Sequence, residues 1–236
     1  MINKFNRIVV VGCGGIGGWL VPPLCRFLHF AHKEGGEKTE IVLIDGDKVE
    51  ERNFTRQNFN GLGYKAELLR DQVAHFTNLR ISTVMEYVTK ANINRHVREN
   101  DLVFMGVDNN ASRKLFSERF EDLADAVMIC GGNEFDDGSV QLYIRKDGEN
   151  FTKSLVESSP SIGDPKDKNP GEAGCEELAV AGAPQLIFTN WRVAALMGEV
   201  FYNVYYTEKP FFPDIVYCSI KGLAQRAVSS KSMEEL

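Results

Sequence analysis

The chain has 236 residues, 43% of them hydrophobic and 25% charged, a composition typical of a soluble folded protein with one domain as the simplest expectation. Its formal charge of -6 disfavours a general nucleic-acid-binding protein, because neutralising phosphates requires clustered lysine and arginine. Glycines within residues 12–18 interrupt the first apolar run, so the sequence predicts neither a signal peptide nor a membrane span.

The five cysteines are an odd number and form no CxxC pair, which disfavours both a disulfide framework and a four-thiolate zinc site. No zinc is therefore expected. Reduced thiols favour a cytoplasmic location. Cys13, Cys25 and Cys130 are expected to be buried packing residues, because cysteine is commonly buried.

Short apolar runs rich in β-branched residues predict strands that are buried on both faces. These buried strands are residues 7–11, 41–44 and 102–105. Further strands are predicted at 82–88 and 127–130, with a half-exposed strand at 140–144 and a last one at 215–219. Segments of helical length and pattern lie at 19–30, 65–79, 92–97, 112–123 and 184–205. Pro22, Pro23 and Pro184 are expected in the first turns of their helices, where proline is tolerated.

Two polar stretches separate these elements. Residues 47–63 predict a loop with some local helix, and residues 146–174, rich in Ser, Pro, Asp, Lys and Gly, predict a long loop with a function of its own. The alternation of strands and helices predicts an α/β fold, a Rossmann-like and mostly parallel sheet flanked by helices. Ligands of such sheets bind beyond the carboxyl ends of the strands.

A glycine-rich loop follows the first predicted strand and opens the first helix. Residues 12–17 fit the pattern GxGxxG, which lets the backbone turn tightly and approach a phosphate at the helix N-terminus. The motif alone suits NAD, FAD or ATP equally. A tight turn without a ligand is the alternative.

Asp45 ends the second predicted strand, within Asp45-Gly46-Asp47. A carboxylate in that position accepts hydrogen bonds from ribose hydroxyls in this fold. The alternative is a solvated residue of a common type of turn.

The segment after Asp45 favours a triphosphate over a dinucleotide. Arg56 lies in Asn53-Phe54-Thr55-Arg56-Gln57, and Lys65 opens the next predicted helix. Cations at this place would stabilise the charge that grows on a leaving pyrophosphate. The alternative is an ordinary polar loop followed by a surface lysine.

Asp108 follows the strand at 102–105, with Arg113 beyond it. A carboxylate at a strand end is a ligand that Mg²⁺ accepts. The alternative is that Asp108 or Asn110 caps the following helix. Asn133, after a further strand, either lines the same site or makes a turn.

Together these residues resemble the ThiF/MoeB/HesA superfamily of ubiquitin-activating-type adenylyltransferases. The pattern covers about residues 8 to 145, and the Asn-x-x-Arg-Gln after an Asp-x-Asp is its specific part. It comprises Gly12, Gly14, Gly15, Gly17, Asp45, Asp47, Asn53, Arg56, Gln57, Lys65, Asp108 and Arg113. By resemblance the chain is one adenylation domain, residues 1–236, with a nucleotide-binding core at 1–145, a crossover loop at 146–183 and a C-terminal helix and tail at 184–236.

The resemblance implies a reaction and a partner. Asp45 would bind the ribose of ATP, Asn53, Arg56 and Lys65 the phosphates, and Asp108 Mg²⁺ and the α-phosphate. The glycines, Asp47, Gln57 and Arg113 would complete the nucleotide site. The acceptor would be the C-terminal carboxylate of a ubiquitin-like or sulfur-carrier protein or a peptide. The enzyme would be a homodimer.

Three features depart from many members of that superfamily. Only six residues precede Arg7, so an arginine that reaches the partner's site is expected to be absent or replaced, by Arg7 or another residue. The spacer between Arg56 and Lys65 is short, and the paired CxxC motifs are missing.

Cys175, near the end of the long polar loop, has the position of the thiol that accepts the acyl group in some members. The neighbouring Glu172, Glu176 and Glu177 oppose thiolate formation, while a helix N-terminus nearby would favour it. A loop cysteine without a catalytic role is the alternative.

Two other functions stay open at this stage. An NAD(P)-dependent oxidoreductase would use the glycine loop and Asp45 but leave Arg56, Lys65 and Asp108 without a role. A nucleotide-binding subunit without turnover, one half of a heterodimer, would carry the same fold.

Overall fold

The computed structural model describes residues 5, 7–33, 39–171, 186–208 and 210–230. Their central feature is a sheet with the order β11-β10-β8-β7-β6-β1-β2-β5. Five neighbouring strands are parallel: β5 (Arg80–Val84), β2 (Glu40–Ile44), β1 (Arg7–Val11), β6 (Asp101–Met105) and β7 (Ala126–Asn133). The remaining strands are antiparallel: β8 (Asp137–Lys146), β10 (Ile215–Ser219), β11 (Gln225–Val228) and the short β9 (Glu149–Asn150), which pairs with β8.

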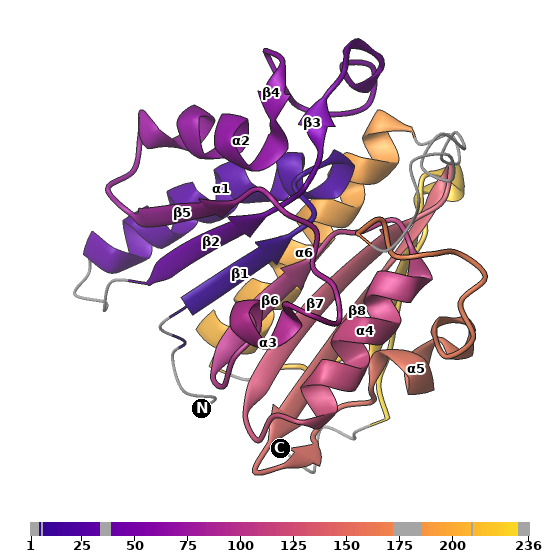
Figure 1. Cartoon of the computed structure of the whole chain (residues 1–236). Helices are drawn as coiled ribbons and strands as arrows, with labels where there is room; N and C mark the ends of the chain where they lie inside the picture. The colour runs from indigo at the N-terminus through magenta and orange to yellow at the C-terminus, as the bar shows by residue number, and fades with distance from the viewer. Residues whose placement is uncertain (1–4, 6, 34–38, 172–185, 209, 231–236) are drawn as a thin grey trace.

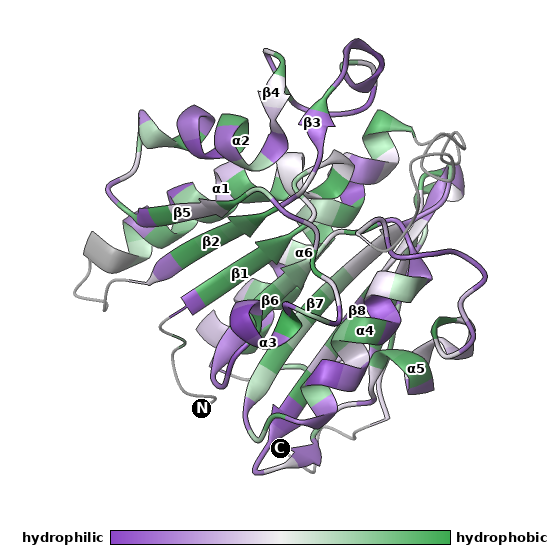
Figure 2. Ribbon diagram, in the orientation of Figure 1, coloured by the Kyte–Doolittle hydropathy of each residue, from purple (hydrophilic) through white to green (hydrophobic). Residues whose placement is uncertain are grey.

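Helices cover the two faces of the sheet (Figure 1). One layer contains α1 (Gly15–Lys33), α2 (Lys65–Ala74) and α6 (Ile187–Tyr206), and the other contains α3 (Ile93–His96), α4 (Asn110–Glu121) and α5 (Leu155–Ser158). The strands show why both faces are covered. Ile8 and Val10 of β1 pack with the first layer, and Val9 and Val11 pack with the second. Figure 2 shows these central strands as continuously hydrophobic, and they lie between two apolar clusters.

The predicted α/β class is therefore confirmed, and so is the mostly parallel sheet. Several boundaries were wrong. Helix α2 ends at Ala74 instead of the predicted residue 79, and the next strand, β5, spans Arg80–Val84 instead of residues 82–88. The short pair β3 (Lys48–Val49) and β4 (Gly63–Tyr64) was missed, although the local helix expected between residues 47 and 63 is present as a 3-10 turn at Glu51–Asn53.

The prolines of α1 correct a second expectation. The helix begins at Gly15, inside the glycine loop, so Pro22 and Pro23 lie in its interior and not in its first turn. Proline has no N–H, so the carbonyl of Gly18 lacks its usual helical donor, the amide of residue 22. The side-chain amide of Asn58 lies 3.5 Å from that carbonyl and replaces part of the lost hydrogen bonding. Pro184 lies outside the described residues.

The long polar stretch is partly ordered into regular elements. It contains β9, α5 and a 3-10 turn at Pro160–Ile162. Ser154 and Glu157 cap α5 reciprocally, because each side chain accepts a hydrogen bond from the other residue's backbone N–H. None of the helices that the structure describes is long and apolar enough to cross a membrane.

Candidate functional site

A cavity of about 490 Å³ lies at the carboxyl ends of the central parallel strands. Four segments that are distant in the sequence supply most of its wall: the glycine loop, the loop from Asp45 to Lys65, residues 86–88, and residues 106–109. Asn169 and Pro170, at the end of the long polar stretch, complete the rim. This is the location that the fold predicts for a ligand.

At two positions of the glycine loop, Gly12 and Gly17, the surrounding backbone leaves no space for a side chain. Gly12 has a φ of 85°, and a Cβ there would lie 2.8 Å from the carbonyl oxygen of Gly106. A Cβ on Gly17 would overlap the carbonyl of Gly12. The loop can therefore close directly onto the start of α1, and Gly14, Gly15 and Ile16 of this segment line the cavity.

Asp45 ties the glycine loop to the end of β2. One carboxylate oxygen accepts a hydrogen bond from the Cys13 amide at 2.7 Å, and the other accepts one from the Asp47 amide at 2.8 Å. Burial raises the pKa of Asp45 to about 6 and the charge of Asp47 adds to this rise, while the charge of Lys65 opposes it. Each oxygen retains a lone pair for a further donor such as a hydroxyl group.

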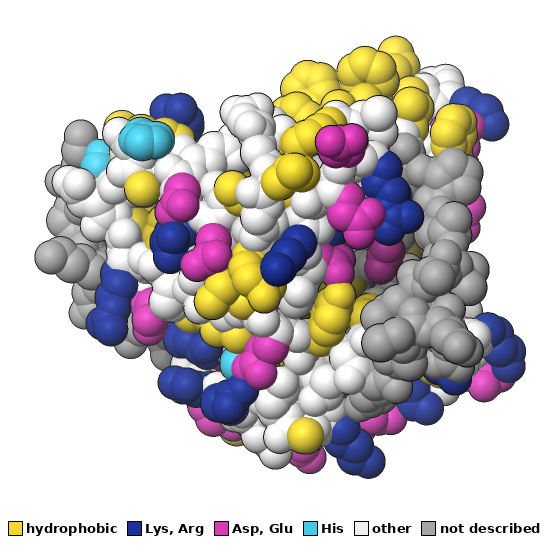
Figure 3. Space-filling model, turned by 45° about the horizontal axis from the view of Figure 1, so that its top comes forward, with side chains coloured by type: hydrophobic (Ala, Val, Ile, Leu, Met, Phe, Trp, Pro, Cys, Tyr) yellow, Lys and Arg dark blue, Asp and Glu magenta, His cyan; other side chains and the backbone are white. Residues whose placement is uncertain are grey.

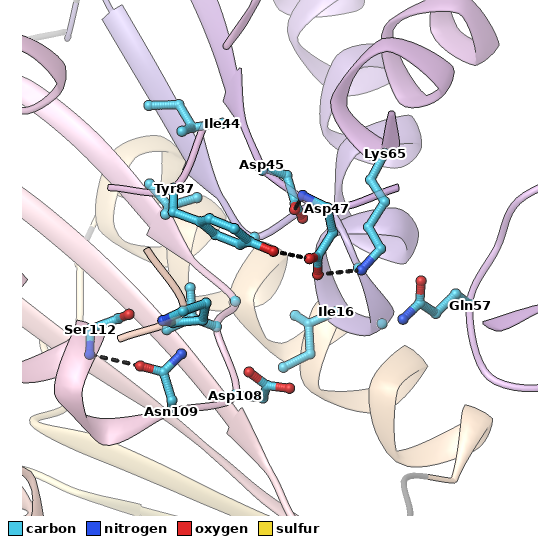
Figure 4. A pocket seen from close by; sticks show the side chains of 18 of the residues that line it. Ile16, Ile44, Asp45, Asp47, Gln57, Lys65, Tyr87, Asp108, Asn109 and Ser112 are labelled. Carbon is cyan, nitrogen blue, oxygen red and sulfur yellow. Dashed lines mark hydrogen bonds and ion pairs between the residues drawn. The ribbon is translucent and has the colours of Figure 1, made fainter. Parts of the chain in front are cut away.

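Lys65 is buried to 7% exposure, and its ammonium group is fixed by Asp47 (Figure 4). The Nζ–Oδ2 distance is 2.8 Å, and the Tyr87 hydroxyl donates to the other oxygen of Asp47. Burial alone would raise the pKa of Asp47, but the charge and hydrogen bond of Lys65, with the hydrogen bond of Tyr87, hold it below the ordinary value. The same ammonium lies 3.9 Å from the position that a Cβ on Gly14 would occupy, so the cation faces the glycine loop.

The Asn53–Gln57 segment contributes in three different ways. Asn53 is buried, and its side-chain oxygen accepts from the Glu50 amide, so it shapes the loop. Gln57 is buried beside Gly14, and its side-chain oxygen has no hydrogen-bond partner among the described residues. Arg56 is half-buried and lines the cavity.

Neither Asp108 nor Asn110 is the N-cap residue of α4. The cap of α4 is Asn109, whose side-chain oxygen accepts from the Ser112 amide at 2.8 Å. Asp167 accepts from the amides of Asn110 and Ala111, each at 2.8 Å. The carboxylate of Asp108 is exposed at the cavity wall, so helix capping does not use it.

Two predicted site residues lie elsewhere. Arg113 does not line the cavity in the described part of the chain; its guanidinium donates to the Val107 carbonyl at 2.9 Å and to the Asn110 side chain at 3.1 Å, and so braces the loop that carries Asp108. Arg7 forms an ion pair with Asp101 at the opposite, amino ends of β1 and β6. Cys175 lies outside the described residues. Cys13, Cys25 and Cys130 are buried, as expected.

Two residues that organise the site carry no sequence motif that would have marked them in advance. Asn190 on α6 has 0% exposure; it donates to the Arg56 carbonyl at 3.1 Å and accepts from the Asn133 side chain at 2.8 Å. A Cβ on Gly15 would lie 2.5 Å from the Asn190 amide nitrogen. Asn133 therefore belongs to the cavity wall, the first of its two expected roles. The second of these two residues is Tyr87, which lies in the loop after β5 and packs against Gly46.

Comparison with known proteins agrees with this geometry. The sequence model of the ThiF family matches residues 2–197. The chain belongs to the ThiF family. No curated protein sequence matches it.

Similar solved structures have the same fold. MccB of E. coli in a structure with succinimide is 19% identical, with a TM-score of 0.68 over 94% of this chain and 63% of that one. MccB in a structure with ATP is also 19% identical, with a TM-score of 0.65 over 94% of this chain and 63% of that one. PaaA is 17% identical, with a TM-score of 0.66 over 94% of this chain and 63% of that one. The chain thus spans slightly less than two thirds of the length of these relatives.

The contact between Tyr87 and Asp47 can be tested by substitution. Tyr87→Phe keeps the ring over Gly46 but removes the hydroxyl, so we expect the free energy of unfolding to fall by about 1 kcal/mol. Urea denaturation at neutral pH measures this. Tyr217→Phe is the matched control, because Tyr217 is a half-exposed tyrosine of β10, outside the cavity. A Tyr87 variant that is as stable as this control would contradict the assigned contact.

The raised pKa of Asp45 predicts a pH dependence. The folded-state value of about 6 exceeds the ordinary 3.8, so the contribution of Asp45 to stability is present below the ordinary pKa and is lost as the pH rises through about 6. Asp45→Asn does not titrate. The wild-type minus variant difference in unfolding free energy should therefore fall between about pH 4 and pH 7. A difference that stays constant over this range would refute the raised pKa.

Proposed function

We propose that this protein uses ATP to adenylylate the C-terminal carboxylate of a peptide or a small ubiquitin-like or sulfur-carrier protein. The observation that carries the proposal is the convergence of Asp45, Arg56, Lys65 and Asp108 around the glycine loop in one cavity. These residues come from four separate places in the chain. A triphosphate needs all of them, and a dinucleotide does not.

The cavity supplies what a bound nucleotide requires. The start of α1 and the glycine loop would accept phosphates, because backbone N–H groups and the helix dipole favour anions there. Asp45 would accept hydrogen bonds from ribose hydroxyls with the lone pairs that the Cys13 and Asp47 amides leave free. Lys65 and Arg56 would contact the β- and γ-phosphates.

The reaction would be an in-line displacement at the α-phosphate. An oxygen of the substrate carboxylate attacks the α-phosphorus, the bond to the bridging oxygen breaks, and pyrophosphate leaves with the electron pair. Lys65 is already fixed beside the glycine loop, so it stabilises the developing charge without a costly reorganisation. Alignment of the two reactants supplies much of the remaining rate.

Mg²⁺ fits the residues present. The Asp108 carboxylate faces the cavity, and no cluster of three acidic, histidine or cysteine ligands exists among the described residues. That donor set suits Mg²⁺, which commonly takes one or two carboxylates together with substrate phosphates and water. When bound, the ion would neutralise phosphate charge.

The relatives support the choice of reactants. The solved structures of MccB include complexes with ATP and with MccA. By analogy we assign a nucleotide and a peptide or protein C-terminus to this cavity as well. Transfer of the acyl group to Cys175 stays a prediction from the sequence.

The two alternatives account for fewer of the side chains. An NAD(P)-dependent oxidoreductase has no use for a buried lysine beside the phosphate loop, nor for the free carboxylate of Asp108. A nucleotide-binding subunit without turnover would retain the ribose and phosphate contacts but would need no carboxylate at residue 108.

Pyrophosphate exchange into ATP tests the proposal. We expect exchange that depends on added peptides or small carrier proteins with a free C-terminus, and a loss of at least about 100-fold in Asp108→Asn with ATP binding retained. Asp122→Asn, at an exposed acid that follows α4, is the matched control. An active Asp108→Asn enzyme would remove the role assigned to that residue. Saturable NAD(P)H binding without ATP binding would favour the oxidoreductase.

A further inference from the structure

Asn133, the last residue of β7, presents a polar side chain to the cavity. The two residues before it have no room for side chains. A Cβ on Gly131 would lie 2.5 Å from the Met197 sulfur, and a Cβ on Gly132 would lie 2.8 Å from a guanidinium nitrogen of Arg113. Asn133 itself is partly exposed and lines the cavity, so the end of β7 contributes this one side chain to the site.

The neighbouring hydrogen bonds determine which amide atom of Asn133 is free. The Arg56 backbone carbonyl can only accept, so Asn190 must offer it the side-chain NH₂ group, at 3.1 Å. The oxygen of Asn190 then faces Asn133, and only the NH₂ group of Asn133 can donate to it, at 2.8 Å. Oδ1 of Asn133 is therefore the free atom, and it accepts no hydrogen bond from any residue that the structure describes.

A free acceptor oxygen selects among the groups of the proposed reactants. Ionised phosphates and an ionised carboxylate have no hydrogen to donate, so they do not pair with Oδ1 of Asn133. Three kinds of donor remain: the ribose hydroxyls, the amino group of adenine, and the N–H of a peptide bond in the acyl substrate.

The strand order separates Asn133 from the expected position of the nucleoside. Asp45, the expected ribose ligand, follows β2, and β1 and β6 lie between β2 and β7. Three inter-strand spacings amount to about 14 Å. The base is attached directly to the ribose, so the peptide N–H is the donor that suits Asn133 best.

The charges of the cavity wall agree with this assignment. Among the described lining residues, every lysine and arginine lies between residues 45 and 65, the segment that contains β3 and β4. Figure 3 turns that part of the molecule toward the viewer, and basic and acidic side chains lie next to one another there. The wall formed by β6, β7, α4 and α6 has Asp108 as its charged residue and is otherwise neutral. A neutral wall suits a peptide bond better than a phosphate.

From this geometry we infer that Asn133 accepts a hydrogen bond from the N–H of the last peptide bond of the acyl substrate, and that Asn190 positions Asn133 for this contact. The inference rests on the proposed function, because it assigns part of the same cavity to the substrate of that reaction. One carbon atom separates this N–H from the carboxylate, so fixing the N–H also aligns the attacking oxygen. The substrate is then a peptide or protein C-terminus, and not a carboxylic acid that lacks an N–H at this position.

Isothermal titration calorimetry with two acylated adenosine 5′-sulfamates tests the inference. In both compounds the sulfamate replaces the phosphate of an acyl-adenylate. One carries N-acetylglycine, and the other carries O-acetylglycolic acid, in which an ester oxygen replaces the amide N–H without adding bulk. We expect wild type to bind the first compound about 10-fold more tightly, which corresponds to one hydrogen bond. Asn133→Ala and Asn133→Leu, which is similar in size to wild type, should bind both compounds equally.

Asn94→Ala is the matched control, because Asn94 is an exposed asparagine of α3 that does not line the cavity. It should keep the wild-type preference, and circular dichroism verifies that each variant is folded. Two outcomes would overturn the inference alone, provided that ATP and the unacylated adenosine 5′-sulfamate still bind: equal affinities in wild type, or an undiminished preference in the folded Asn133 variants. If neither ATP nor the unacylated compound bound, the proposed function would fail, and this inference with it.

Discussion

The candidate site depends on the placement of one buried cation. Lys65 is almost inaccessible to solvent, and burying an ammonium group without a partner is costly. Asp47 supplies the partner at 2.8 Å, and the Tyr87 hydroxyl fixes Asp47 in turn. The result is a positive charge held beside the glycine loop before any ligand arrives. Asp45 completes the arrangement, because its hydrogen bonds to the Cys13 and Asp47 amides join the glycine loop to the end of β2.

Much of the fold and part of the site could be predicted from local sequence. The central strands are short, apolar and rich in β-branched residues. They occur where expected, because a strand that is buried on both faces requires a continuous run of hydrophobic residues. Lys65, Asp45 and the glycines could be found because each lies directly after a strand or at the start of a helix. Helix ends were less predictable: α1 begins inside the glycine loop despite two interior prolines, since tertiary contacts outweigh local propensity.

The residues that the sequence did not reveal act through long-range contacts. Asn190 lies 134 positions from Arg56, to whose carbonyl it donates a hydrogen bond, and no motif in the sequence of α6 marks it as a site residue. Tyr87 follows a strand of ordinary composition and reaches Asp47 only because β5 pairs with β2. Arg113 was assigned to the nucleotide by its place in a motif, yet in the structure it braces the loop that presents Asp108.

The most direct test of this account is a crystal structure with a non-hydrolysable ATP analogue and Mg²⁺. The account predicts the triphosphate along the glycine loop, with Lys65 and Arg56 on the phosphates and Asp45 on the ribose. It also predicts that Lys65 moves little, because Asp47 and Tyr87 already position it. A nucleotide bound elsewhere, or one whose phosphates are contacted by neither cation, would contradict the central claim.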